Sequence, residues 1–411
     1  MERKVSTTIG MMTVDRTTIF RRLSGKYYIA FKDPRRKPSL SSMFSVRLTE
    51  VALPTSEREI DNLVGWFIDT LCLVRKRGEA TADQGRAGPV HRLLRDYLFA
   101  QPEVSWDAQM LADELALTPA SLNHHLTRLV EAGIIGFSNE GKGWRRYFLR
   151  GGSLTNAIEF FSLQCETIVR QRMMLLDSLW NRGNPNIGSE PIPTETPALS
   201  IGIVDHRPLL PESEENMLSQ WMGDFGLLGE RPGKEAHAES ISVQLFQLLL
   251  NRDLPLSLDE ASEVLDEQKP RIGRILERFR STGMVQRVPR IDRLNVALWS
   301  AMTTQYQRRG EDWMLKKGGF QRILNTKQQS SILSSLKKGK FKVEEVEKVI
   351  KGISSDEQML LLNLLGGRLP LGHRMVGYTS EDVHREIAAR IDKTLRRMRR
   401  VAQLLEQAMV S

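Results

Sequence analysis

Two stretches of the chain share the same spacing of apolar residues before a glycine, and each has a proline 13 or 14 residues ahead of that glycine. The first, at 103–138, reads EVSWDAQMLADELALTPASLNHHLTRLVEAGIIGFS, and the second, at 254–288, reads LPLSLDEASEVLDEQKPRIGRILERFRSTGMVQRV. When Gly133 is matched to Gly283, the apolar positions of the two stretches fall into register. An internal repeat constrains the architecture of a chain more than any single motif, so we expect two copies of one small domain.

The elements of the first copy are marked by capping and turn residues. Pro89 begins a helix that ends near residue 101, and after a short extended piece Asp107 can cap a second helix. Thr118, followed by a proline, begins a third helix, and Gly133 ends it in the left-handed conformation that glycine tolerates best. The segment 134–149 has two apolar runs around a glycine-rich turn, which predicts a hairpin.

This order of helix, short strand, helix, tight turn, helix and hairpin is that of a winged helix-turn-helix. The tight turn sets the third helix across the second, so that its outer face can enter a major groove. The predicted fold is therefore mainly α with small β-hairpin wings, containing tandem winged helix-turn-helix domains and a helical C-terminal region. We expect the second wing directly after the second copy, at 286–298.

The third helix also carries a family resemblance. The segment TPASLNHHLTRLVEAGII (118–135) resembles winged-helix regulators of the ArsR and MarR type, in which a Ser/Thr-Pro start, a His-His-Leu centre and an Ala-Gly-Leu/Ile end are common. The resemblance covers roughly 89–150, with a fainter echo at 245–300, and implies a dimeric transcription regulator. The chain departs from these families in its length and its two modules. The metal-sensing cysteine pair of the second helix is missing, so metal sensing does not carry over.

The polar side of the third helix supplies the candidate DNA contacts. Leu122, Leu126 and Leu129 face inward, which turns the opposite side outward. Asparagine can pair with adenine, histidine can donate to guanine, and arginine can reach guanine or phosphate. The predicted DNA-binding residues are Thr118, Ser121, Asn123, His124, Thr127 and Arg128 on this helix, Lys142, Arg145 and Arg146 on the hairpin, and Arg271, Arg274 and Arg278 on the third helix of the second copy. We assign His125 to packing or a phosphate contact.

Neither a metal site nor a catalytic site is expected. Adjacent helical residues point about 100° apart, so His124 and His125 cannot readily chelate one ion, and zinc pairs favour i and i+4. Cys72 and Cys165 are the only cysteines and form no CxxC motif. The glycine-rich stretch 223–235 fails the phosphate-loop pattern, and no catalytic signature is present. We therefore predict no cofactor and no enzymatic activity.

The length of 411 residues suggests two or three globular units. The segment 14–37, which mixes cations with aromatic residues, fits a solvated helix followed by a strand better than a nucleic-acid contact. The predicted divisions are a basic N-terminal region (1–80), a first winged-helix domain (89–150), a long packing or dimerisation helix (153–182), a proline-rich, acidic linker region (183–240), a winged-helix-like domain (241–310), a basic helical region (311–378) and a coiled-coil-like helix (380–410).

The last helix has apolar residues at the a and d positions of three heptads: Ala388, Ile391, Leu395, Met398, Ala402, Leu405 and Met409. Such a seam can pair with a second copy of the chain or with the chain's own helices, and we favour dimerisation. The helix at 153–180, which is apolar on more than one face, is the competing site and should pack against a partner helix. The lysines of 311–351 fit a solvated face better than a further DNA-backbone surface.

The net charge of +9 favours a polyanionic partner. We expect a sequence-specific protein that binds double-stranded DNA, a homodimeric transcription regulator that recognises an inverted repeat. One alternative is a replication initiator or partition protein that binds direct repeats as a monomer; another is a winged-helix protein-interaction scaffold. RNA polymerase or replication proteins are the further partners these roles imply. No apolar run reaches roughly 18 residues, so we expect no membrane partner and a cytoplasmic, nucleoid-associated location.

Overall fold

The computed structural model divides the chain into two units, 1–43 and 44–411, which are described separately. In the first unit, β1 (Ile19–Leu23) pairs antiparallel with β2 (Lys26–Ala30), so the helix expected in the first part of 14–37 is wrong. In the second unit the structure describes residues 44–74, 88–139, 145–180, 196–205, 214–229, 232–233 and 237–410. The described part is mainly helical with small antiparallel sheets, as predicted.

The first copy of the repeat begins earlier than the sequence suggested. Its elements are β3 (Ser45–Thr49), α1 (Ile60–Thr70), α3 (Pro89–Arg92) continuing into the π-helical turn η1 (Leu93–Phe99), β4 (Trp106–Asp107), α4 (Ala108–Glu114), α5 (Pro119–Glu131), β5 (Ile135–Ser138), β6 (Arg146–Leu149), the 3-10 turn η2 (Arg150–Gly152) and α6 (Leu154–Leu179). Leu48 of β3 and Phe67 of α1 are fully buried, so this part of the predicted N-terminal region belongs to the core. Asp107 and Thr118 cap α4 and α5 as expected.

The second copy has counterparts of the main helices and of three of the four strands, in the same order. They are β7 (Ser200–Val204), α7 (Glu214–Asp224), α8 (Ile241–Asn251), α9 (Leu258–Val264), α10 (Lys269–Ser281), β8 (Val285–Pro289), β9 (Leu371–Met375) and α16 (Ser380–Val410). Ile201 of β7 and Trp221 of α7 are buried in the main core, so the predicted linker region contains structural elements of the second copy. The sequence analysis missed these two short apolar segments because the residues around them are rich in proline and acidic side chains.

Strand registers match between the copies. Ile135 of β5 lies opposite Leu149 of β6, and Val285 of β8 lies opposite Met375 of β9. In the first copy β4 pairs with β6 to complete a three-stranded sheet in the order β4-β6-β5. In the second copy the isolated bridge from Leu256 to β9 takes the place of β4. The strand β9 is therefore the counterpart of β6.

The connection between β8 and β9 holds a separate helical domain, which we call the inserted domain (290–370). Its elements are η3 (Ile291–Arg293), α11 (Leu294–Lys316), α12 (Phe320–Ile323), α13 (Thr326–Lys337), α14 (Val343–Ile350) and α15 (Ser355–Leu364), and they enclose a second hydrophobic core. The expectation of a hairpin at 286–298 is wrong, because α11 begins inside that range. Helix α11 also runs across the predicted division at 310, with a kink at Gly310.

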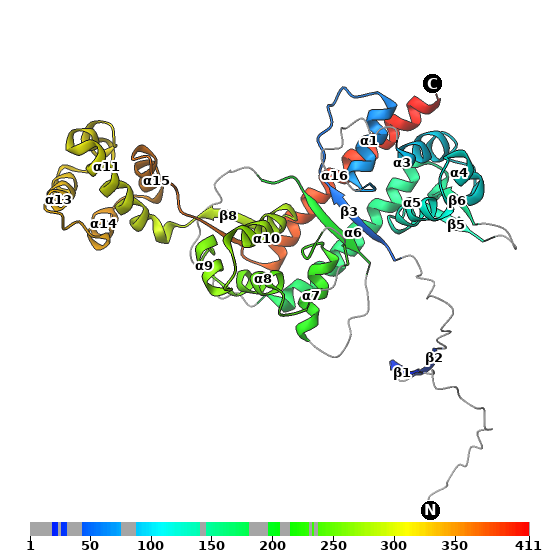
Figure 1. Cartoon of the computed structure of the whole chain (residues 1–411), viewed down its shortest axis with the longest axis horizontal. Helices are drawn as coiled ribbons and strands as arrows, with labels where there is room; N and C mark the ends of the chain where they lie inside the picture. The colour runs from blue at the N-terminus through cyan, green and yellow to red at the C-terminus, as the bar shows by residue number, and fades with distance from the viewer. Residues whose placement is uncertain are drawn as a thin grey trace, which may run out of the picture. The chain divides into compact units, whose positions relative to one another are not determined.

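Equivalent elements of the two copies pack on each other (Figure 1). Strands β3 and β7 pair antiparallel, with Arg47 opposite Gly202 at the centre, and α6 packs along α16. Helix α1 contacts α16, and from α7 the indole of Trp221 donates a hydrogen bond to the carbonyl of Arg172 on α6, at 2.9 Å. An antiparallel pair of equivalent strands has a local two-fold axis, and the contacts of α1 with α16 and of α7 with α6 are likewise reciprocal between the copies.

This packing accounts for the apolar seam of the last helix. Five of the seven seam residues are buried within the single chain, namely Ile391, Leu395, Met398, Ala402 and Leu405, whereas Ala388 and Met409 are half-buried. The long helix α6 does pack against a partner helix, as predicted, and that partner is α16 of the same chain. Most of the seam that we expected to drive dimerisation is therefore covered by the chain itself.

Candidate nucleic-acid interface

Helix α5 exposes a polar face opposite its buried leucines. Leu122 and Leu126 are almost fully buried, whereas Asn123, His124 and Thr127 are exposed. The hydroxyl of Thr118 accepts a hydrogen bond from the backbone N–H of Ser121, at 3.2 Å, and so stabilises the first turn. Thr118 is exposed and Ser121 is half-buried. The helix thus presents an asparagine, a histidine and a threonine, which can all form hydrogen bonds with base edges.

Arg128 has a different place from the one predicted. Its guanidinium donates to the carbonyl of Cys72 and to that of Leu73, at 2.5 Å each. Cys72 has a positive φ of 49° just after α1 ends, so the arginine holds a strained turn of the backbone against α5. Because these charge-assisted bonds engage its guanidinium, Arg128 holds α5 against the turn after α1 and is less available to a ligand than predicted.

His125 lies beside the buried face, as expected. It is half-buried, and its Nδ1 has no hydrogen-bond partner among the residues that the structure describes. Burial, and then the charges of His124 and Arg128, lower the pKa of His125 below its ordinary value. The imidazole is therefore neutral near pH 7 and acts as a packing group.

The hairpin beside α5 contributes two exposed arginines. The guanidinium of Arg145 lies 4.9 Å from the centre of the exposed Phe137 ring, a cation–π contact that orients the charge. Arg146 is exposed, and its Nη2 donates to the carbonyl of Ser105 at 3.2 Å. The third hairpin residue that we singled out, Lys142, lies outside the described residues.

The three arginines of α10 that were predicted to bind DNA differ in their exposure and in their partners. Arg271 is exposed and forms an ion pair with Glu267 one turn before it. Arg278 is half-buried, with Nη1 3.4 Å from the carbonyl of Leu227. Arg274 is exposed, donates to the carbonyl of Pro270 at 3.3 Å, and has no acidic partner in the described part of the chain. Of the three, Arg274 is the side chain most available to a ligand.

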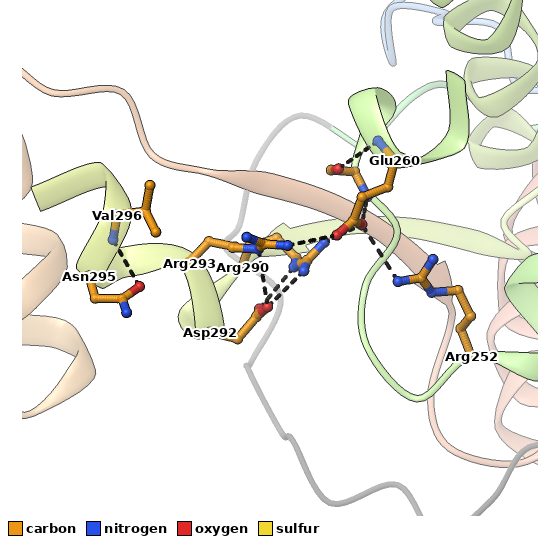
Figure 2. A network of polar contacts seen from close by, with 8 residues as sticks. Arg252, Glu260, Arg290, Asp292, Arg293, Asn295 and Val296 are labelled. Carbon is orange, nitrogen blue, oxygen red and sulfur yellow. Dashed lines mark hydrogen bonds and ion pairs between the residues drawn. The ribbon is translucent and has the colours of Figure 1, made fainter. Parts of the chain in front are cut away.

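The base of the inserted domain is held by a network of charges that the sequence analysis missed (Figure 2). Arg290 is 2% exposed and lies between two carboxylates, with Nη1 2.6 Å from Glu260 of α9 and Nη2 2.7 Å from Asp292. Arg252 and Arg293 lie near the same Glu260. A signal was present in the sequence, since Ser257 and Glu260 have the spacing of a capping box, which α9 does form.

The network keeps its carboxylates ionised. Burial alone would raise the pKa of Glu260, but hydrogen bonds from Arg290 and from the backbone of Ser257, with the nearby charges, lower it to about 2. The hydrogen bond from Arg290 likewise lowers the pKa of Asp292. The backbone N–H of Arg290 donates to the carbonyl of Pro370 at 2.8 Å, which joins the two chain segments that enter and leave the inserted domain.

His373 of β9 is a partly buried imidazole whose pKa differs from its ordinary value. Burial, followed by the positive charge of Arg280, lowers the pKa of His373 to about 4, and its Nδ1 has no hydrogen-bond partner among the described residues. Arg287 lowers the same pKa, whereas Glu277 and the backbone at Leu256 raise it. In the first copy the matching position opposite β4 is Tyr147.

We expect the His373→Phe variant to flatten the acid dependence of stability. The unfolded chain takes up a proton near pH 6.5 and the folded chain only near pH 4, so this histidine costs stability as the pH falls through that window. The cost is on the order of 2 kcal/mol once residual solvent contact is allowed for. Urea unfolding at pH 7.0, 5.5 and 4.5 measures it, with His384→Phe as the control. Equal slopes for the wild type and H373F would contradict the assignment.

In the described ranges no helix is long and apolar enough to cross a membrane. In the same residues no three His, Cys, Asp or Glu side chains are grouped so that they could hold a metal ion. The buried thiol of Cys165 has a pKa raised by burial and by the charge of Glu166, which leaves it protonated and unreactive.

Comparison with known proteins gives no further guide to this interface. No family model matches the chain, and neither the curated proteins nor the solved structures contain a significant match.

Proposed function

We propose that this protein binds double-stranded DNA sequence-specifically, through two winged-helix modules carried on one chain. The observation that carries the proposal is the exposed face of α5, where Asn123, His124 and Thr127 stand on a capped helix beside the exposed arginines of the hairpin. In such an arrangement the third helix reads base edges while cations on the hairpin contact phosphates.

The internal two-fold relation of the copies suggests how one chain would do this. Paired strands β3 and β7 and packed helices α6 and α16 take the place of a dimer interface. A single chain would then present α5 and α10 to two half-sites in inverted orientation. Because α10 carries Arg271 and Arg274 where α5 carries Ser121 and His124, the two half-sites would differ in sequence. We therefore propose an asymmetric site bound by one chain, in a regulator of transcription that needs no second copy.

Selection of bound sequences from a random duplex pool tests this function. We expect the wild type to enrich one sequence and the N123A/H124A variant to lose preference at two or three adjacent positions. Each lost base contact is worth about 1–3 kcal/mol, or roughly tenfold to a hundredfold in preference. The matched control is Gln101→Ala/Gln403→Ala, which removes two exposed side chains away from α5. Enrichment of the same sequence by the N123A/H124A variant with equal strength would refute the site.

A replication initiator is the second candidate, and one observation favours it. Because the seam of α16 is buried within the chain, the two modules are available to a protein that binds DNA as a monomer, as such initiators do. Footprints separate the two roles. Tandem direct repeats, each covered by one chain, favour the initiator, whereas one asymmetric inverted site favours the regulator. RNA polymerase is the further partner in the regulator case and replication proteins in the initiator case. If the protein shifts no duplex in a gel at low ionic strength, the protein-interaction scaffold is the remaining candidate function.

A further inference from the structure

The inserted domain emerges where the second module would have the tip of its wing. In the first copy the matching connection between β5 and β6 is only the seven residues 139–145, and its last residue, Arg145, is exposed. In the second copy the strands β8 and β9 diverge into the inserted domain instead. A wing tip lies on the phosphates or in the minor groove next to the base-reading helix. This domain therefore replaces a DNA-contacting turn in the chain topology.

One loop of the inserted domain concentrates positive charge. The sequence KKGKFK at 337–342, which we call the lysine loop, places four lysines within six residues. Lys337, Lys338, Lys340 and Lys342 are all exposed, and none forms an ion pair within the described part of the chain. Four unpaired ammonium groups on one loop match the spacing of charges along a nucleic-acid backbone better than they match a single small anion.

The lysine loop has a fixed backbone. Gly339 takes a positive φ of 66° and ends α13, and the N–H of Lys340 donates to the carbonyl of Ser335 at 3.1 Å. Phe341 is buried in the second core, and its carbonyl accepts a hydrogen bond from the indole of Trp299 at 3.0 Å. Because the backbone is ordered before any ligand arrives, contacts by the lysine side chains cost less entropy.

A plain structural role explains only part of this charge. Lysines at the end of a helix interact favourably with its dipole, which accounts for Lys337 and Lys338. Lys340 and Lys342 lie beyond the helix and have no such role. The acidic residues that follow, Glu344 and Glu345, lie in the first turn of α14, where their negative charges interact favourably with the helix dipole.

We propose that the lysine loop binds the phosphate backbone of duplex DNA outside the half-site contacted by α10, and so lengthens the footprint on one side. This inference rests on the proposed function. The loop would add affinity without adding sequence preference, because phosphates carry no direct sequence information. Each lysine that neutralises a phosphate releases counterions, which contributes about 0.9 to the slope of log affinity against log salt.

The test compares two quadruple variants of the full-length protein on the selected duplex. The loop variant is K337Q/K338Q/K340Q/K342Q, and the control is K316Q/K317Q/K348Q/K351Q, which removes four other exposed lysines of the same domain. We expect the loop variant to lower the salt slope by about 2 to 4 and to shorten hydroxyl-radical protection on one flank, with the selected sequence unchanged. Circular dichroism and the thermal midpoint check that both variants fold.

Each outcome decides between the two proposals. Specific binding with an unchanged slope and footprint in the loop variant would overturn the role of the lysine loop alone. An equal loss in the control would assign the effect to the charge of the whole domain and overturn it too. Binding without sequence preference that only the loop variant weakens would support the loop and refute the proposed function. If the wild type protects no duplex at low salt, both fail.

Discussion

Replacing Asp224 by alanine is expected to lower the free energy of unfolding by about 3–5 kcal/mol. Asp224 of α7 and Arg172 of α6 are each 2% exposed, with Nη2 and Oδ2 2.7 Å apart. The alanine would remove the carboxylate that lies against the buried guanidinium, which is far more costly than losing an exposed pair. Because α6 belongs to the first copy and α7 to the second, this ion pair also joins the two copies.

Urea unfolding followed by tryptophan fluorescence measures this effect. The control is Asp392→Ala, which breaks an exposed pair with Arg396 inside α16, where the side chains are 45% and 68% exposed. That control should cost less than about 1 kcal/mol. The double variant R172M/D224L, which buries two apolar groups in place of the pair, should recover much of the loss. A cost for D224A as small as that of D392A would show that the pair does not hold the copies together.

The second large effect is expected for Arg290→Met at the base of the inserted domain. Removing this buried cation takes away the partner that Glu260 and Asp292 share and leaves them only the more exposed Arg252 and Arg293, at a cost of about 3 kcal/mol. Arg293→Met is a matched control, because Arg293 contacts the same Glu260 at 3.3 Å but is 55% exposed. We expect the control to cost less than about 1 kcal/mol.

The pH dependence of the Arg290 variant distinguishes loss of charge pairing from loss of packing. The folded pKa of Glu260 is about 2, below the ordinary value of 4.5, so this group stabilises the wild type above pH 4.5 and stops doing so as the pH falls towards 2. In R290M the pKa of Glu260 should return towards its ordinary value. The difference in stability between wild type and variant should then shrink between pH 4.5 and pH 2. A difference that stays constant over this range would contradict the role given to the network.

Local signals in the sequence were sufficient for the limits and faces of α4 and α5 in the first copy. Asp107 and Thr118 cap the helices they were expected to cap, because a cap depends on a side chain and the backbone two or three residues away. The leucines of α5 face the core and Asn123 and His124 face outward, because a 3.6-residue period fixes both faces at once. The matched glycines at 133 and 283 both have positive φ, at 69° and 82°.

Only the tertiary structure showed which strands pair with each other and which helices pack together. The sequence alone could not tell that Val285–Pro289 pairs with Leu371–Met375 across a whole inserted domain, because strand pairing over such a distance leaves no periodic trace. Nor could it tell that Arg128 bonds to the turn after α1. A heptad pattern shows that a helix has an apolar seam, but the hydrophobic effect is non-directional, so the pattern does not specify whether the covering helix comes from the same chain or from another. Here it comes from the same chain, as α6.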